Sequence, residues 1–149
     1  MESLKDRIYS RYVDVGKRSG CSCASEFAVN PYFNRLVRKH FPSAHDAAIL
    51  DLGCGDGALL RTAGQIGYTN ARGIDGSPQQ VARAQLAGLT NVELGDLRGA
   101  LSQMDDESED CVIAFDVLEH FSRDEIGDIC VAVHRVLRQG GQFIAHVPN

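Results

Sequence analysis

The segment AILDLGCGDGALL, residues 48–60, constrains the fold of this chain more than any other stretch. An apolar run ends near Asp51, a glycine-rich turn follows, and a helix-forming stretch of small and apolar residues comes directly after it. Glycine allows the main chain to turn sharply and to come close to a ligand. The segment therefore predicts a buried strand, a tight turn and a helix, with the turn at the carboxyl end of a strand, where α/β sheets bind their ligands.

Strand-like and helix-like patterns alternate from Ala47 to the end of the sequence. The expected strands cover residues 47–52, 71–75, 91–95, 111–116 and 142–147. The expected helices cover residues 56–67, 77–88 and 122–141, with a weaker one at 97–104. This alternation predicts an α/β fold, a Rossmann-like doubly wound and mostly parallel sheet.

The chain is long enough for one domain, with 149 residues of which 44% are hydrophobic. We divide it into a helical N-terminal lid or preface at 1–45 and a ligand-binding core at 46–149. The preface holds helix-like stretches near residues 3–13 and 30–41, and Tyr32 or Arg35 in the second could reach a ligand.

Charge and composition exclude several function classes. The net charge is −5 and the 15 basic residues form no cluster, which argues against a nucleic-acid partner. No apolar stretch reaches the roughly 18 residues of a membrane span, and the N-terminus is too charged for a signal peptide. Five cysteines without framework spacing favour a reducing compartment, so we expect a cytoplasmic protein without a membrane partner.

The charges of the glycine-rich turn separate two kinds of ligand. Gly53, Gly55 and Ala58 satisfy the spacing of a dinucleotide-binding turn, which alone is a weak signal. However, Asp51 and Asp56 would repel a pyrophosphate placed at the start of the following helix. Two acids there suit a cation, and S-adenosylmethionine carries an ammonium and a sulfonium but no phosphate.

Two further acids stand at the ends of the next expected strands. Asp75 could accept hydrogen bonds from both hydroxyls of a ribose, in a nicotinamide dinucleotide or in S-adenosylmethionine. Asp96 could accept from an adenine amine while Leu97 lies against the ring. Each lone Asp can equally be a turn or a helix cap, but three acids at three successive strand ends favour a binding site.

The motifs ILDLGCGDG, GIDGSPQQV, VELGDLRGAL and DVLEHF, in this order, resemble those of class I S-adenosylmethionine-dependent methyltransferases over residues 47–149. More narrowly, the sequence resembles a bacterial group associated with polysaccharide or sugar modification. The resemblance implies a cofactor site made of Asp51, Gly53, Cys54, Gly55, Asp75, Gly76, Ser77, Asp96, Leu97, Phe115 and Asp116. Gly76 departs from the pattern, because many relatives carry a larger apolar residue there.

The segment FDVLEHF places Asp116, Glu119 and His120 at helical spacing just beyond the fourth strand. His120 could be a general base oriented by Glu119, and we take these two as the catalytic candidates. Alternatively, the three side chains could hold a divalent metal, which we do not expect, or Asp116 and Glu119 could form a helix capping box. His146, at the end of the fifth strand, could also face the methyl acceptor.

We therefore expect methyl transfer from S-adenosylmethionine to a hydroxyl of a small-molecule acceptor. The resemblance to the bacterial group suggests a sugar or glycan precursor as that acceptor. The alternatives are a nicotinamide-dependent oxidoreductase and a non-catalytic S-adenosylmethionine-binding module. The resemblance implies seven strands, of which residues up to Asn149 supply five. The chain is thus expected to be a fragment of a longer enzyme or to form a homo-oligomer through the exposed edge at 142–147.

Overall fold

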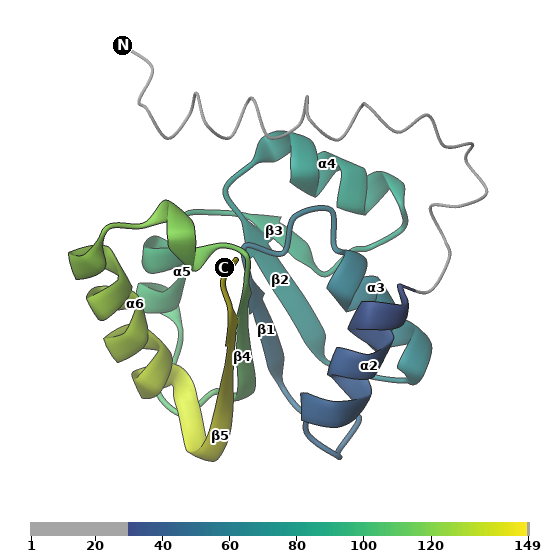
Figure 1. Cartoon of the computed structure of the whole chain (residues 1–149), viewed down its shortest axis with the longest axis horizontal. Helices are drawn as coiled ribbons and strands as arrows, with labels where there is room; N and C mark the ends of the chain where they lie inside the picture. The colour runs from purple at the N-terminus through teal and green to yellow at the C-terminus, as the bar shows by residue number, and fades with distance from the viewer. Residues whose placement is uncertain (1–29, 149) are drawn as a thin grey trace.

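The computed structural model describes residues 30–148 and contains one five-stranded sheet. All of its strand pairs are parallel, in the order β3-β2-β1-β4-β5 (Figure 1). The strands are β1 (Ile49–Leu52), β2 (Ala71–Asp75), β3 (Val92–Leu94), β4 (Glu109–Phe115) and β5 (Leu137–His146). The expected Rossmann-like doubly wound sheet is therefore confirmed.

Helices cover both faces of the sheet (Figure 1). The α-helices are α2 (Pro31–His40), α3 (Ala58–Ile66), α4 (Pro78–Leu86), α5 (Leu97–Gln103) and α6 (Arg123–Val136). A short 3₁₀ helix, η2 (Leu118–His120), follows β4. The helix expected near residues 30–41 is α2, whereas the stretch expected at 3–13 lies outside the described residues.

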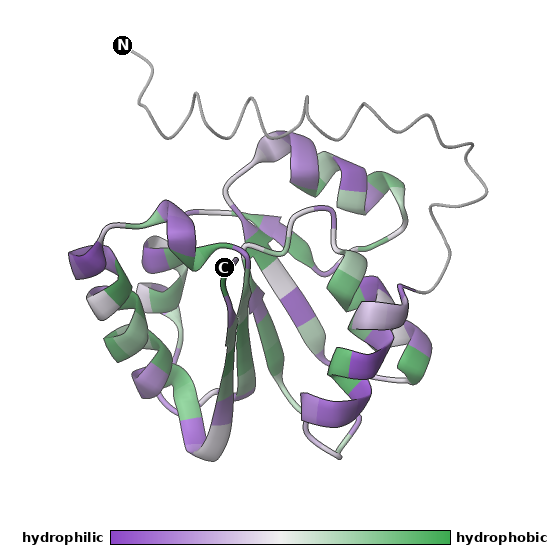
Figure 2. Cartoon of the chain, in the orientation of Figure 1, coloured by the Kyte–Doolittle hydropathy of each residue, from purple (hydrophilic) through white to green (hydrophobic). Residues whose placement is uncertain are grey.

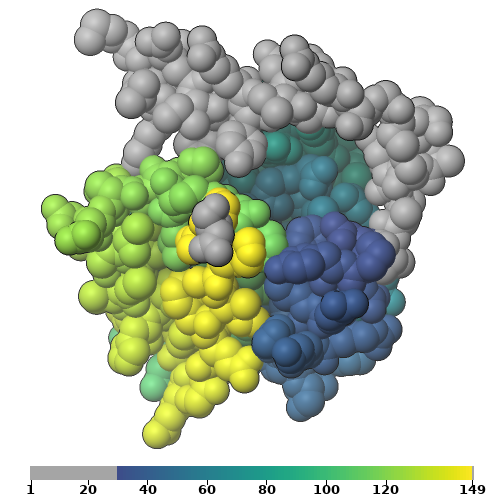
Figure 3. Space-filling view, in the orientation of Figure 1, coloured from purple at the N-terminus to yellow at the C-terminus, as the bar shows by residue number. Residues whose placement is uncertain are grey.

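Two apolar clusters form the core, one on each face of the sheet. The first joins α2, α3 and α4 to residues such as Ile49 and Ile113, and the second joins α5 and α6 to Leu50 and Val112. Successive strand residues point to opposite faces, so the central strands are apolar on both sides (Figure 2). The edge strand β5 is only partly covered and is exposed between α2 and α6 (Figure 3).

Local capping explains where the helices begin. Ser122 and Glu125 form a capping box at the start of α6, and Ser77 caps α4 with Pro78 at its first position. The expected end of the last helix was wrong, because α6 stops at Val136 and the next residue already belongs to β5. Leu137 pairs with Glu109, so hydrogen bonding to the sheet ends the helix before the glycines at 140 and 141.

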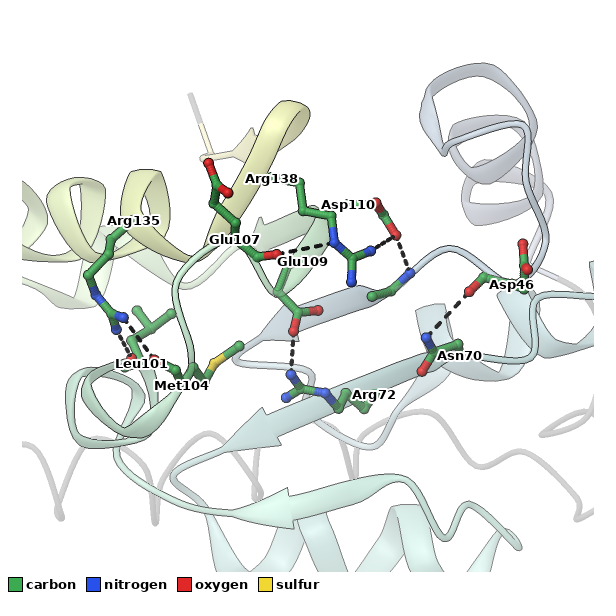
Figure 4. A network of polar contacts seen from close by, with 11 residues as sticks. Asp46, Asn70, Arg72, Leu101, Met104, Glu107, Glu109, Asp110, Arg135 and Arg138 are labelled. Carbon is green, nitrogen blue, oxygen red and sulfur yellow. Dashed lines mark hydrogen bonds and ion pairs between the residues drawn. The ribbon is translucent and has the colours of Figure 1, made fainter.

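Charged side chains form ion pairs and hydrogen bonds between strands at the edge of the sheet where the strands begin (Figure 4). Arg72 pairs with the buried Glu109, the first residue of β4. Asp110 accepts from Arg138 Nη1 at 2.6 Å and from the Ala48 N–H at 2.7 Å. These ion pairs lie at the edge opposite to the glycine turn. Within residues 30–148 no helix is long and apolar enough to span a membrane.

Candidate functional site

A glycine turn, residues 53–57, connects β1 to α3 at the carboxyl edge of the sheet. Gly53, Gly55 and Gly57 all have left-handed backbone angles, with φ of 71°, 57° and 76°. The N–H groups of Gly53 and Cys54 donate to Ile74 O at 2.8 and 3.2 Å, which ties the turn to β2. At Gly53 a Cβ atom would lie 2.4 Å from Val117 Cγ2, so this position accepts glycine alone.

Gly55 differs from its neighbours because open space lies beside it. A Cβ atom built there would meet nothing within 4 Å. Its N–H donates to Asp75 Oδ2 at 2.8 Å, so the turn and the end of β2 are held together. This open space beside a bare backbone is where a ligand could approach the main chain closely.

Asp75 is only 7% exposed and serves as the acceptor that organises this edge. Its Oδ1 accepts from the Ser77 N–H and its Oδ2 from the Gly55 N–H, both at 2.8 Å. A carboxylate offers about four acceptor positions. About two therefore remain, which is the number that the two hydroxyls of a ribose require.

Asp51 is the most unusual group of the site. It is 2% exposed, and its Oδ1 is buried without a hydrogen-bond partner among the described residues. Burial, and then the negative charge of Asp75, raises the pKa of Asp51 to about 8. A cation that donates hydrogen bonds would satisfy the unpaired oxygen and favour the ionised carboxylate, so the site fits the ammonium group of S-adenosylmethionine.

Cys54 fills space rather than offering a reactive thiol. Its side chain is buried, and burial together with Asp51 and Asp75 raises the pKa of the thiol, so a thiolate is disfavoured. A Cβ atom at Gly73 would lie 2.6 Å from the Cys54 side chain, so that glycine makes room for it. Cys54 therefore lines the turn sterically.

The remaining predicted cofactor residues fall into two groups. Asp96 stands exposed after β3 and caps α5 by accepting from the Gly99 N–H at 2.9 Å, while Gly76 is exposed after β2. Ser77 and Leu97 are buried; Ser77 caps α4, and Leu97 packs in the core cluster beneath α5 and α6. The structure thus brings Asp96 and Gly76 to the same edge as Asp75, while the Leu97 side chain belongs to the core.

The geometry at residues 116–120 differs from the helix that the sequence predicted. Asp116 has a left-handed φ of 52°, and the helix that follows is the 3₁₀ turn η2, capped by Val117 without a side-chain bond. The alternative of a capping box from Asp116 to Glu119 was therefore wrong. Glu119 is exposed and His120 is half-buried on η2. Across residues 30–148 no three His, Cys, Asp or Glu side chains gather as metal ligands would.

Asp116 instead pairs with His146. The sequence suggested that His146 could face the methyl acceptor but did not reveal this partner. The distance from His146 Nδ1 to Asp116 Oδ1 is 2.6 Å, and both side chains are 42% exposed. The two residues are 30 positions apart. Only the pairing of β4 with β5 brings them together, so no local sequence signal could have shown the contact.

An aromatic cluster surrounds this pair. Phe115 stacks on the His146 ring with centroids 4.4 Å apart, and Tyr32 and Phe33 of α2 meet Phe115 edge-on at 5.8 and 5.4 Å. The predicted residue Phe115 therefore lies at the carboxyl edge in contact with α2. This cluster places the start of α2 beside the ends of β4 and β5.

Comparison with known proteins identifies the family. A family model described as a methyltransferase domain matches residues 50–145. This chain belongs to that family. The fold and the methyltransferase assignment expected from the sequence are thereby confirmed, and S-adenosylmethionine is the cofactor of such domains.

The curated relatives act on proteins, as their names state. The ribosomal protein L11 methyltransferase of Clostridium botulinum is 34% identical over 107 residues, which are 67% of this chain and 31% of the relative. The human EEF1A lysine methyltransferase 2 is 31% identical over 96 residues, 60% of this chain and 40% of the relative. The chain thus spans about a third of the length of the curated relatives that it matches.

Solved structures show the same fold. An S-adenosylmethionine-dependent methyltransferase from Mesorhizobium loti is 29% identical with a TM-score of 0.64, and the match covers 74% of this chain and 51% of that chain. A second such enzyme, from Archaeoglobus fulgidus, has a TM-score of 0.69 at 19% identity, covering 79% and 52%.

Proposed function

We propose that this chain binds S-adenosylmethionine at the carboxyl edge of its sheet and transfers the methyl group to a hydroxyl of a small molecule. The bound cofactor would supply an activated methyl group on a sulfonium. Asp51 would hold the ammonium end, Gly53, Cys54 and Gly55 would line the path of the ligand, and Asp75 would hold the ribose. Gly76, Ser77 and Asp96 would border the adenine, Leu97 would support them from the core, and Phe115 and Asp116 would close the site from β4.

One observation carries this proposal, namely the buried and unpaired oxygen of Asp51 on β1, the strand that leads into the glycine turn. An unpaired buried acceptor is unfavourable, so a ligand that donates to it gains affinity. The start of α3 also argues against a pyrophosphate. Asp56 Oδ1 already accepts from the Ala58 N–H at 3.2 Å, so a carboxylate occupies the helix end that a dinucleotide phosphate would need.

Isothermal titration calorimetry with S-adenosylhomocysteine and, separately, with NADH tests the donor assignment. We expect S-adenosylhomocysteine alone to bind, and Asp75→Asn to weaken binding at least about 30-fold, because two hydrogen bonds to a charged group are weakened. Asp105→Asn, at an exposed position after α5, is the matched control. Binding of NADH alone would show that the proposed donor is wrong.

The acceptor chemistry is a separate part of the proposal. His120, with Glu119 to orient it, is one candidate for the base, and a loss of methyl transfer in His120→Gln would support it. Sugars and glycan precursors are the acceptors suggested by the narrower resemblance. A homo-oligomer joined through β5 is a further proposal, supported by its exposed edge, and analytical ultracentrifugation tests it.

A protein amine is the second candidate acceptor, because both curated relatives are named for protein substrates. Radiolabelled methyl transfer to small hydroxyl compounds and to a protein mixture, measured with the same preparation, separates the two candidates. Label found only in protein would replace the small-molecule proposal.

A further inference from the structure

The pair formed by Asp116 and His146 has the geometry of a general base and the residue that positions it. We propose that His146 accepts the proton of the methyl acceptor and that Asp116 holds the imidazole for this task. This inference rests on the proposed function, since it needs a methyl donor at the same edge of the sheet.

The pair lies on the donor side of the sheet. Asp51 is in register with Ile113, and His146 is in register with Phe115, two residues further along β4. With about 4.8 Å between strands and 3.3 Å per residue, the Cα atoms of Asp51 and His146 are about 12 Å apart on one face. The neighbouring Val117 packs against Gly53, so the segment that carries Asp116 touches the glycine turn directly.

Two contacts fix the position of Asp116. Its side chain meets His146 Nδ1, and its N–H donates to His146 O at 3.0 Å. These contacts hold Asp116 at a φ of 52°, a left-handed angle that an aspartate adopts at an energetic cost. Strained backbone held in place by its surroundings is a recurring feature of functional sites.

The hydrogen bond to Asp116 also sets the tautomer of His146. A carboxylate accepts only, so Nδ1 carries the hydrogen and the lone pair is left on Nε2. Phe115 holds the ring plane by stacking at 4.4 Å, with Tyr32 of α2 edge-on at 6.4 Å. Asp116 and Tyr32 are the titratable groups that face the ring, the first from the end of β4 and the second from α2. No hydrogen bond within residues 30–148 engages Nε2, and the 42% exposed side chain can reach an acceptor.

The acceptor oxygen forms a bond to the methyl carbon while its proton passes to His146 Nε2. The bond between the methyl carbon and sulfur breaks, and its electron pair stays on sulfur, which becomes neutral. Asp116 stays ionised beside the imidazolium, and the proton then leaves from His146 to solvent.

The tautomer can be measured without knowing the acceptor. In the ¹⁵N-labelled full chain, NMR of the histidine rings, with the His146 signals assigned by their loss in His146→Gln, should show Nδ1 protonated. Asp116→Asn should shift His146 towards the Nε2-protonated form, because an amide can donate to Nδ1. A wild-type ring protonated mainly on Nε2 overturns the inference.

The catalytic role is tested with two phenols of different acidity, which the aromatic cluster can accommodate. In mildly alkaline buffer 4-nitrophenol is already ionised, whereas phenol, like a tyrosine side chain, is not. His146→Gln should lower kcat/KM for phenol at least about 100-fold, and for 4-nitrophenol less than about 10-fold. The matched control His134→Asn changes an exposed histidine on α6 and should leave both rates unchanged.

Separate outcomes distinguish the inference from the proposed function. Failure to bind S-adenosylhomocysteine would reject the donor assignment itself. Binding with unchanged phenol transfer in His146→Gln, or a loss seen only in His120→Gln, would reject His146 as the base and leave the donor site intact. Binding without transfer to either phenol by the wild-type chain would reject a hydroxyl acceptor for this base.

Discussion

Asp51→Asn should change how the stability of the fold depends on pH. Burial and Asp75 raise the pKa of Asp51 from 3.8 to about 8, so the folded chain keeps a proton there that the unfolded chain releases. The stability of the wild type therefore falls as the pH rises from about 4 to about 8, and this contribution is constant outside that window. Asparagine at position 51 cannot titrate, so the variant lacks the decline.

The size of the effect follows from the shift. One proton that differs between the folded and unfolded chains changes the free energy of unfolding by about 1.4 kcal/mol per pH unit. Between about pH 5.5 and 7.5 the variant should therefore gain about 3 kcal/mol relative to wild type. Asp51 is fully buried, so solvent screening does not reduce this figure greatly.

Urea unfolding at several pH values between these limits measures the difference between the two chains. Asp105→Asn removes an exposed carboxylate and should run parallel to wild type across the range. A difference between Asp51→Asn and wild type that stays constant within about 1 kcal/mol would show that Asp51 is ionised throughout, and the electrostatic argument would fail.

Three further substitutions test the glycine turn and the ion pairs opposite it. Gly53→Ala should lower the free energy of unfolding by about 2 to 4 kcal/mol, measured with urea, because the added Cβ atom clashes with Val117. When Val117 is also changed to Ala, the loss should be smaller. Gly55→Ala should lower the free energy of unfolding by only about 1 kcal/mol, because alanine must adopt the left-handed φ of this position. Calorimetry should nevertheless show S-adenosylhomocysteine binding weakened about 10-fold. Unchanged affinity would mean that the ligand does not pass this glycine. Arg72→Ala should lower the free energy of unfolding by about 2 kcal/mol, because Glu109 stays buried without its partner. Thermal unfolding should show a smaller loss when Arg72→Ala is added to a Glu109→Gln chain. An equal loss in that chain would contradict this reason.

The position of the glycine turn and of Asp75 at one edge of the sheet could be predicted from the sequence because its determinants are local. The glycine turn follows β1 and Asp75 is the last residue of β2, and parallel strands bring their ends to one edge. The boundary between α6 and β5 could not be predicted, because Leu137 leaves the helix to pair with Glu109 across the sheet. The turn at Asp116 was missed for the same reason, since its left-handed angle depends on His146.

The two halves of the site therefore differ in what encodes them. The proposed donor half consists of main-chain groups of the glycine turn and two buried carboxylates, so changes there disturb the fold. On the acceptor half, Tyr32, Phe115, Asp116 and His146 come from three separate elements and meet only at the surface of the folded chain. Because these side chains are half-buried or exposed, they can be exchanged at little cost to stability. The fold shared with the relatives can thus carry different side chains at the ends of β4 and β5, and under our proposal these side chains select the acceptor.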